Sequence, residues 1–207
     1  LVSISFLAIT AIVNSLGVIP SAGVGVAEKL CGFVMMVPSA YGQSMTAFVA
    51  QNVGASREDR ARRVLLYGVL SSLAAGLVMC WGTFFHGDVL TGIFAKDTEV
   101  IAAAAEYLKA YAIDCMLTPF LFCFTGYYNG CEKTLFVMIQ GIIGAFFVRI
   151  PVAYLMSRMA GATLFQIGLS TPASSVVQIL LCLSMFLFLE RRSAGQSHAS
   201  LKGSADP

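Results

Sequence analysis

The chain alternates between long apolar runs and short charged clusters. Residues 1–27 carry no charge, and a second uncharged run extends from 30 to 56 after Glu28 and Lys29. Four more apolar segments follow. A helix needs about 20 mostly apolar residues to cross a bilayer. The pattern therefore predicts six membrane-spanning helices, at about residues 2–19, 30–51, 64–85, 101–128, 134–157 and 162–189.

The expected fold is all-α. Backbone groups in lipid must bond within the protein, which leaves helices or closed barrels, and runs this continuous lack the alternation of barrel strands. The composition agrees, because only 12% of residues are charged against about 25% in soluble domains. We expect residues 1–192 to form one membrane lobe and the polar residues 193–207 to be a disordered cytoplasmic tail.

The basic residues predict an orientation. Lys and Arg are enriched in cytoplasmic connections. If the first helix starts in the cytoplasm, the cytoplasmic side holds Arg57, Arg60, Arg62, Arg63, Lys133, Arg191 and Arg192, and the outer side holds Lys29, Lys96 and Arg158. We therefore expect a multi-pass protein of the plasma membrane with both ends in the cytoplasm. The net charge of +2 is too small to indicate a nucleic-acid partner.

Enzymatic and metal chemistry are not indicated. The six cysteines form no CxxC pair and fall mostly within apolar runs, where they are expected to pack as small apolar residues. The two histidines, His86 and His198, are isolated in an expected outer loop and in the tail. We therefore expect no enzyme activity, no cofactor and no bound metal.

Two charged residues lie inside expected spans. Asp114 is well inside the fourth span, where a charge is costly and suggests a function. It could bind a proton, sodium or a cationic drug, or it could reach water near the outer end or pair with Lys109. Arg149, in the fifth span, could pair with a carboxylate such as Asp114 or hydrogen-bond carbonyls freed by Pro151.

Polar uncharged residues within or at the ends of the spans are further candidates for a binding site. Asn14, Gln43 and Gln140 could line a cleft or hold helices together by hydrogen bonds.

Several blocks of residues, in order, resemble the C-terminal lobe of multidrug and toxin extrusion (MATE) transporters. They are Gly23–Lys29, Pro38–Gln43, Gln51–Ala55, Tyr128–Thr134 and Val148–Pro151. The resemblance covers about residues 1–192. It implies a transporter with two six-helix lobes that rock about a central cleft, and this chain would be one lobe. Since Leu1 lies within an apolar run, we expect a fragment whose partner is the absent N-terminal lobe.

The resemblance also implies a coupling cation, sodium or a proton. Some sodium-coupled members carry a carboxylate at the position that matches Thr118, one turn after Asp114. Those members also carry a glutamate on the first helix of the lobe, whereas Val2–Phe6 contains no acid here. The sodium site of that branch is therefore incomplete, and coupling would rest on an acid in the absent lobe.

The leading hypothesis is secondary active transport. The complete protein would export cationic or amphipathic drugs and toxins in exchange for Na⁺ or H⁺, across membrane lipid. The tentative cation- or substrate-binding residues are Asp114, Thr118, Arg149, Gln43, Asn14 and Gln140. The alternatives are a lipid-linked oligosaccharide flippase of the same superfamily and a non-transporting structural lobe.

Overall fold

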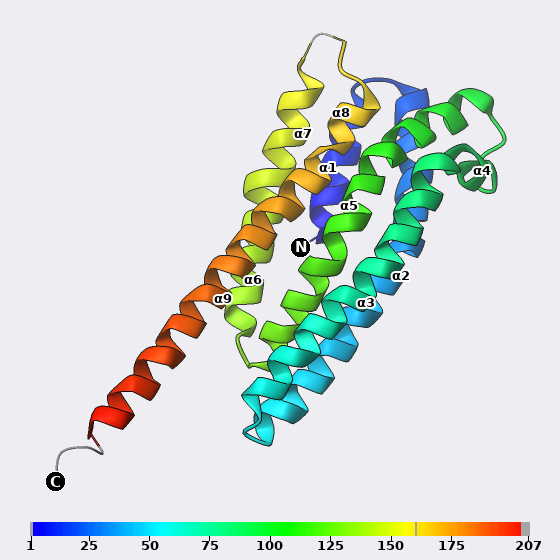
Figure 1. Cartoon of the computed structure of the whole chain (residues 1–207). Helices are drawn as coiled ribbons and strands as arrows, with labels where there is room; N and C mark the ends of the chain where they lie inside the picture. The colour runs from blue at the N-terminus through cyan, green and yellow to red at the C-terminus, as the bar shows by residue number, and fades with distance from the viewer. Residues whose placement is uncertain (1, 160, 204–207) are drawn as a thin grey trace.

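The computed structural model describes residues 2–159 and 161–203, and it folds them into a bundle of helices (Figure 1). The helices are α1 (Val2–Asn14), α2 (Val18–Gly54), α3 (Glu58–Phe85), α4 (Gly87–Gly92), α5 (Thr98–Gly130), α6 (Thr134–Ile142), the π-helix η1 (Ile143–Arg149), α7 (Ile150–Ser157), α8 (Leu164–Gly168) and α9 (Ser170–Gly203). The described part contains no strand, which confirms the all-α fold.

Helix α5 is the centre of the bundle and contacts α2, α3, α4, α8 and α9. Small residues let its neighbours come close. A Cβ on Gly126 of α5 would meet the carbonyl oxygen of Gly42 on α2, and one on Gly76 of α3 would lie 2.6 Å from the carbonyl oxygen of Cys115. Tight packing at such positions is how membrane helices associate in the absence of a hydrophobic driving force.

The first expected boundary is wrong. The first helix ends at Asn14, and Gly17 adopts a φ of +124°, a conformation that favours glycine. Helix α2 therefore begins at Val18, within the first expected span, and Glu28 and Lys29 lie within α2 instead of in a connection. Five helical segments of the described residues are long and apolar enough to cross a membrane, and α1 is shorter.

The fifth expected span, 134–157, is present but is not uniform. Residues Thr134–Ser157 run through α6, η1 and α7, and the π-helical segment ends just before Pro151. Pro151 has no backbone N–H to continue the α-helical ladder, which is a recognised cause of local irregularity. Similarly, the sixth span breaks between α8 and α9, and Pro172 lies in the first turn of α9.

The final helix continues beyond its expected end. α9 extends to Gly203 and leaves the bundle as a single helix (Figure 1), so helix covers much of the segment that the sequence led us to expect as a disordered tail. Residues 204–207 of that tail lie outside the described residues.

Figure 1 also shows that the connections divide between the two ends of the bundle. The α2–α3 and α5–α6 turns lie at one end, and the connections through α4 and between α7 and α8 lie at the other.

Two apolar clusters hold the bundle together along α5. The first surrounds Tyr107, Leu108 and Tyr111, and the second surrounds Cys123 and Tyr128. Between Tyr111 and Cys123, α5 carries two buried polar side chains, Asp114 and Thr118, in the middle of the lobe.

Candidate functional site

A cavity of about 860 Å³ lies beside the middle of α5 and is lined by residues from α1, α2, α5, α6, η1 and α9. On α5 its lining residues recur every three or four positions, at Tyr111, Asp114, Thr118, Leu121 and Thr125. This spacing places them on one helix face. The cavity brings together four of the six predicted site residues, Asp114, Thr118, Gln140 and Arg149.

Asp114 is 1% exposed and carries an incomplete set of hydrogen bonds. Ser175 of α9 lines the same cavity, and Oδ1 of Asp114 has no hydrogen-bond partner. Thr118 donates from Oγ1 to the backbone carbonyl of Asp114 at 2.7 Å, so it stabilises the turn and does not contact the carboxylate itself. One carboxylate oxygen is therefore available to a ligand.

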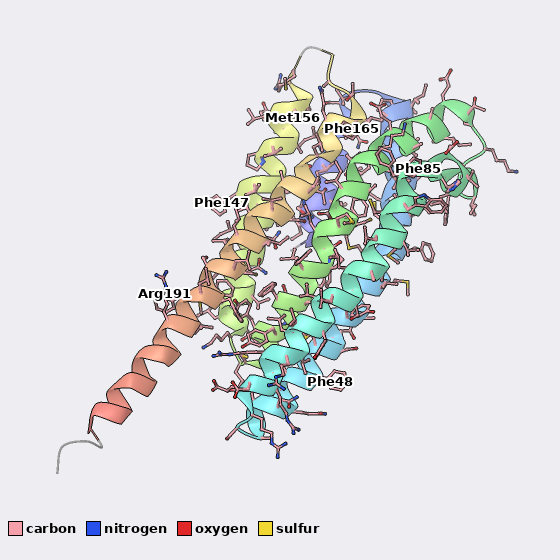
Figure 2. All side chains as sticks on the ribbon, in the orientation of Figure 1. Phe48, Phe85, Phe147, Met156, Phe165 and Arg191 are labelled. Atoms are coloured by element: carbon pink, nitrogen blue, oxygen red, sulfur yellow. The ribbon has the colours of Figure 1, made fainter. Side chains whose placement is uncertain are left out.

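Arg149 supplies the positive charge of the site. Its Nη1 donates to Ser5 Oγ at 3.2 Å, and its Cζ lies 4.9 Å from the centroid of the Phe6 ring, both on α1. These contacts differ from the two predicted for it. Nε has no partner. Phe147, close by on the same helix, is 72% exposed and points away from the bundle (Figure 2).

Unpartnered polar atoms gather on the cavity wall. Besides Asp114 Oδ1 and Arg149 Nε, they include Gln140 Oε1 and Thr171 Oγ1, on side chains that are at most 3% exposed. A buried polar atom without a partner costs about 1–3 kcal/mol. Three of these four atoms are oxygens, so the wall is suited to receive a cation or a hydrogen-bond donor.

Glu28 is the charged residue of the cavity that was not predicted, because it was assigned to a connection; Thr171 and Ser175 of α9 were not predicted either. The Glu28 carboxylate accepts a hydrogen bond from Thr10 Oγ1 of α1 at 3.1 Å. It lines the cavity with Cys31, Met35 and Ser39 of α2. Their helical spacing could have revealed Glu28 if residues 18–54 had been interpreted as one helix.

The other two predicted residues do not line the cavity. Asn14, at the end of α1, is exposed and accepts a hydrogen bond from Ser21 Oγ. Gln43 is exposed on α2, and its Nε2 lies 3.4 Å from Oγ of Ser39, which does line the cavity. Among the residues described, no group of three or more His, Cys, Asp or Glu side chains could hold a metal ion.

The five helical segments of the described residues that are long and apolar enough to cross a membrane define a multi-pass membrane protein. Residues 1–155 match the MatE family, so the chain belongs to that family. This confirms the resemblance proposed from the sequence.

The relatives extend well beyond the chain. It is 22% identical over 192 residues to the probable multidrug resistance protein YoeA of Bacillus subtilis, covering 93% of this chain and 42% of that protein. It is 25% identical over 154 residues to the multidrug and toxin extrusion protein 2 of Oryctolagus cuniculus, covering 74% of this chain and 26% of that protein. The chain thus spans less than half the length of these relatives. Family membership supports the expectation that it is not an enzyme.

Solved structures show the same fold. A MATE protein in the bent conformation superposes with a TM-score of 0.82 at 20% identity, covering 90% of this chain and 41% of that one. An outward-facing MATE family multidrug resistance transporter gives a TM-score of 0.82 at 20% identity, covering 91% of this chain and 42% of that one. The chain therefore has the fold of about one lobe of these structures.

Proposed function

We propose that this chain is one lobe of a secondary active transporter that exports cationic or amphipathic compounds in exchange for Na⁺ or H⁺. The observation that carries the proposal is the unpartnered Oδ1 of buried Asp114 in a cavity of about 860 Å³. That volume suits a drug-sized molecule. Family membership and the names of the relatives support export of drugs as the activity.

The cavity wall suggests a division of roles. Asp114, Gln140 and Thr171 present the oxygens that would hold the coupling cation or the positive group of a substrate. Thr118 would position the turn that carries Asp114. Met35 and Met138 also line the cavity, and their flexible thioether side chains suit substrates of varied shape.

The charges of the wall favour a cationic substrate over a lipid-linked pyrophosphate. Glu28 and Asp114 are acidic and Arg149 is the basic residue among those lining the cavity. A pyrophosphate headgroup would need more positive charge than one arginine supplies. A purely structural lobe would gain nothing from buried atoms left without partners, which cost stability.

A second lobe would complete the cleft, because the chain covers 41% of the matched structure's length. We place the protein in the plasma membrane with the arginine-rich α2–α3 turn in the cytoplasm. That turn and Lys133 in the α5–α6 turn lie at the same end of the bundle, as the positive-inside rule requires.

The proposal is tested by ethidium efflux from pump-deficient cells that express the complete transporter containing this chain. Asp114→Asn should abolish efflux without lowering the amount of protein in the membrane. Asp88→Asn removes the same charge from an exposed position on α4 and should leave efflux intact. Collapsing the sodium and proton gradients separately identifies the coupling ion. Wild-type efflux by Asp114→Asn would overturn the assigned role of Asp114.

A further inference from the structure

A second hollow lies on the outside of the lobe, between α2 and α3. It has a volume of about 840 Å³ and shares no lining residue with the central cavity. We call it the α2–α3 groove. Tyr41, Ser44 and Phe48 line it from α2, and Val64, Tyr67 and Ser71 line it from α3. The Phe48 and Tyr67 side chains are 56% and 68% exposed, so the groove opens away from the bundle.

The groove exists because a glycine lies where the two helices meet. A Cβ on Gly68 of α3 would collide with the terminal methyl group of Met45 on α2. Met45 is 3% exposed, so it forms a closed apolar floor. Because Gly68 has no side chain, Met45 can pack against α3 there and form the floor between the exposed rings of Phe48 and Tyr67.

One end of the groove leads to a basic depression at the α2–α3 turn. Arg57, Arg60 and Arg63 line this depression with exposed side chains, together with the carboxylates of Glu58 and Asp59. Phe48 lies toward this end of the bundle (Figure 2).

The arginines and the groove share one face of α3. Arg60, Arg63, Tyr67 and Ser71 recur at intervals of three or four residues, which aligns them along the helix. At about 1.5 Å per residue, Ser71 lies roughly 12 Å beyond Arg63. A positive end and an apolar slot therefore follow one another along the direction in which a lipid lies in a bilayer.

We propose that the α2–α3 groove binds one anionic phospholipid. Its phosphate contacts Arg60 and Arg63, its glycerol region lies beside Tyr67, and one acyl chain occupies the groove above Met45. The occupant is a lipid because the slot is exposed, mostly apolar and runs along two helices that are long and apolar enough to cross a membrane, and it is anionic because three arginines outnumber two carboxylates at the headgroup end. Such clusters attract anionic lipids of the cytoplasmic leaflet. The proposal does not depend on the transport activity.

The test is competitive retention of lipid by the complete purified protein. The protein in detergent receives equal amounts of phosphatidylglycerol and phosphatidylcholine with identical acyl chains, and mass spectrometry of the intact complex counts the bound lipids. Wild type should retain phosphatidylglycerol in preference. Arg60→Gln and Arg63→Gln should each reduce that preference about fivefold, which is 1 kcal/mol per arginine near a membrane surface converted at 1.4 kcal/mol per tenfold.

Matched controls separate this site from a general charge effect. Arg158→Gln removes an exposed positive charge near the opposite end of the bundle and should leave the preference unchanged. Circular dichroism and gel filtration confirm that each variant is folded. An unchanged preference in Arg60→Gln/Arg63→Gln, or an equal loss in Arg158→Gln, would overturn the proposal.

The acyl chain is tested by filling the groove. Ser44→Phe should reduce phosphatidylglycerol retention although all arginines remain, whereas Ala74→Phe, at an exposed α3 position outside the groove, should not. Glycerol phosphate carries a phosphate group but no acyl chains, and it should not displace the lipid at equal concentration. Displacement by glycerol phosphate, or full retention in Ser44→Phe, would show that the groove takes no part and would overturn the proposal.

Discussion

The two acids of the central cavity lie in different surroundings. The Glu28 carboxylate is half-buried and accepts a hydrogen bond from Thr10, whereas Asp114 is 1% exposed and leaves Oδ1 unpartnered. A buried charge with few partners gains most from binding a counter-ion. Asp114 is therefore the residue at which ion or substrate binding would have the largest effect.

Arg149 and Asp114 should stabilise the fold jointly. Arg149→Gln removes a buried charge and its hydrogen bond to Ser5 Oγ, and it should destabilise the protein by about 1.5–3 kcal/mol, the range for hydrogen bonds to charged groups. The loss of stability in the double variant Arg149→Gln/Asp114→Asn should be smaller than the sum of the losses in the two single variants, by at least about 0.5 kcal/mol. Thermal unfolding in detergent measures all three.

The control for this double-mutant cycle combines Arg158→Gln with Asp114→Asn. Arg158 is exposed and contacts Tyr154, so its removal should add to that of Asp114 without coupling. If the stability effects of the Arg149 and Asp114 substitutions were also strictly additive, the only contacts that hold Arg149 would be those with Ser5 and Phe6.

At the scale of elements, the close contact between α2 and α5 depends on glycines, because a residue without a side chain lets the two helix backbones approach each other. Gly126→Ala would place a methyl group against the Gly42 carbonyl and 2.8 Å from Met45 Cβ, and backbone cannot move aside as a flexible side chain can. We expect a loss of about 1–3 kcal/mol in stability, the usual range for overpacking. Melting temperatures in detergent provide the measurement.

Gly82→Ala is the control for that substitution. A Cβ on Gly82 of α3 meets nothing within 4 Å, and alanine favours helix, so the melting temperature should stay the same or rise slightly. If Gly126→Ala were equally harmless, the close approach of α2 and α5 would not be important for stability.

Long apolar runs predicted most helices well because the cost of exposing backbone to lipid leaves little choice of structure. The boundary at Glu28–Lys29 failed because two adjacent charges were taken as a connection, whereas Glu28 is stabilised within α2 by a residue of another helix, Thr10. Tertiary contacts of this kind leave no local signal. The sequence therefore predicted the number of long segments better than their ends.

The π-helical segment explains why the site could be predicted only in part. Asp114 and Thr118 share a face of a regular helix, so their common location follows from spacing. Gln140 and Arg149 would point to roughly opposite sides of a regular α-helix, which turns about 100° per residue. The wider turns of η1 change that relation, and both residues line the cavity.

At the scale of the whole molecule, the bundle separates packing from binding. One apolar cluster surrounds Tyr107 and the other surrounds Tyr128, and the buried Asp114 and Thr118 lie between these two tyrosines along α5. The clusters stabilise the lobe on either side, so the buried polar atoms of the cavity can remain without partners. Four of the six buried polar atoms without a partner in the described residues belong to cavity-lining side chains, so most of this cost falls on the site itself.

The arrangement of the connections predicts which positions share a side of the membrane. In a variant whose native cysteines are replaced, single cysteines at Ser56 and Thr134 should share one side of the membrane, and those at Thr98 and Met159 should share the other. These positions carry no charge, so the substitutions preserve the distribution of Lys and Arg that sets orientation. With a membrane-impermeant maleimide, Thr98→Cys and Met159→Cys should react on intact cells, and Ser56→Cys and Thr134→Cys only after permeabilisation. The reverse pattern would keep the helical arrangement and invert the proposed orientation, whereas labelling of Ser56→Cys and Thr134→Cys from different sides would contradict the arrangement itself.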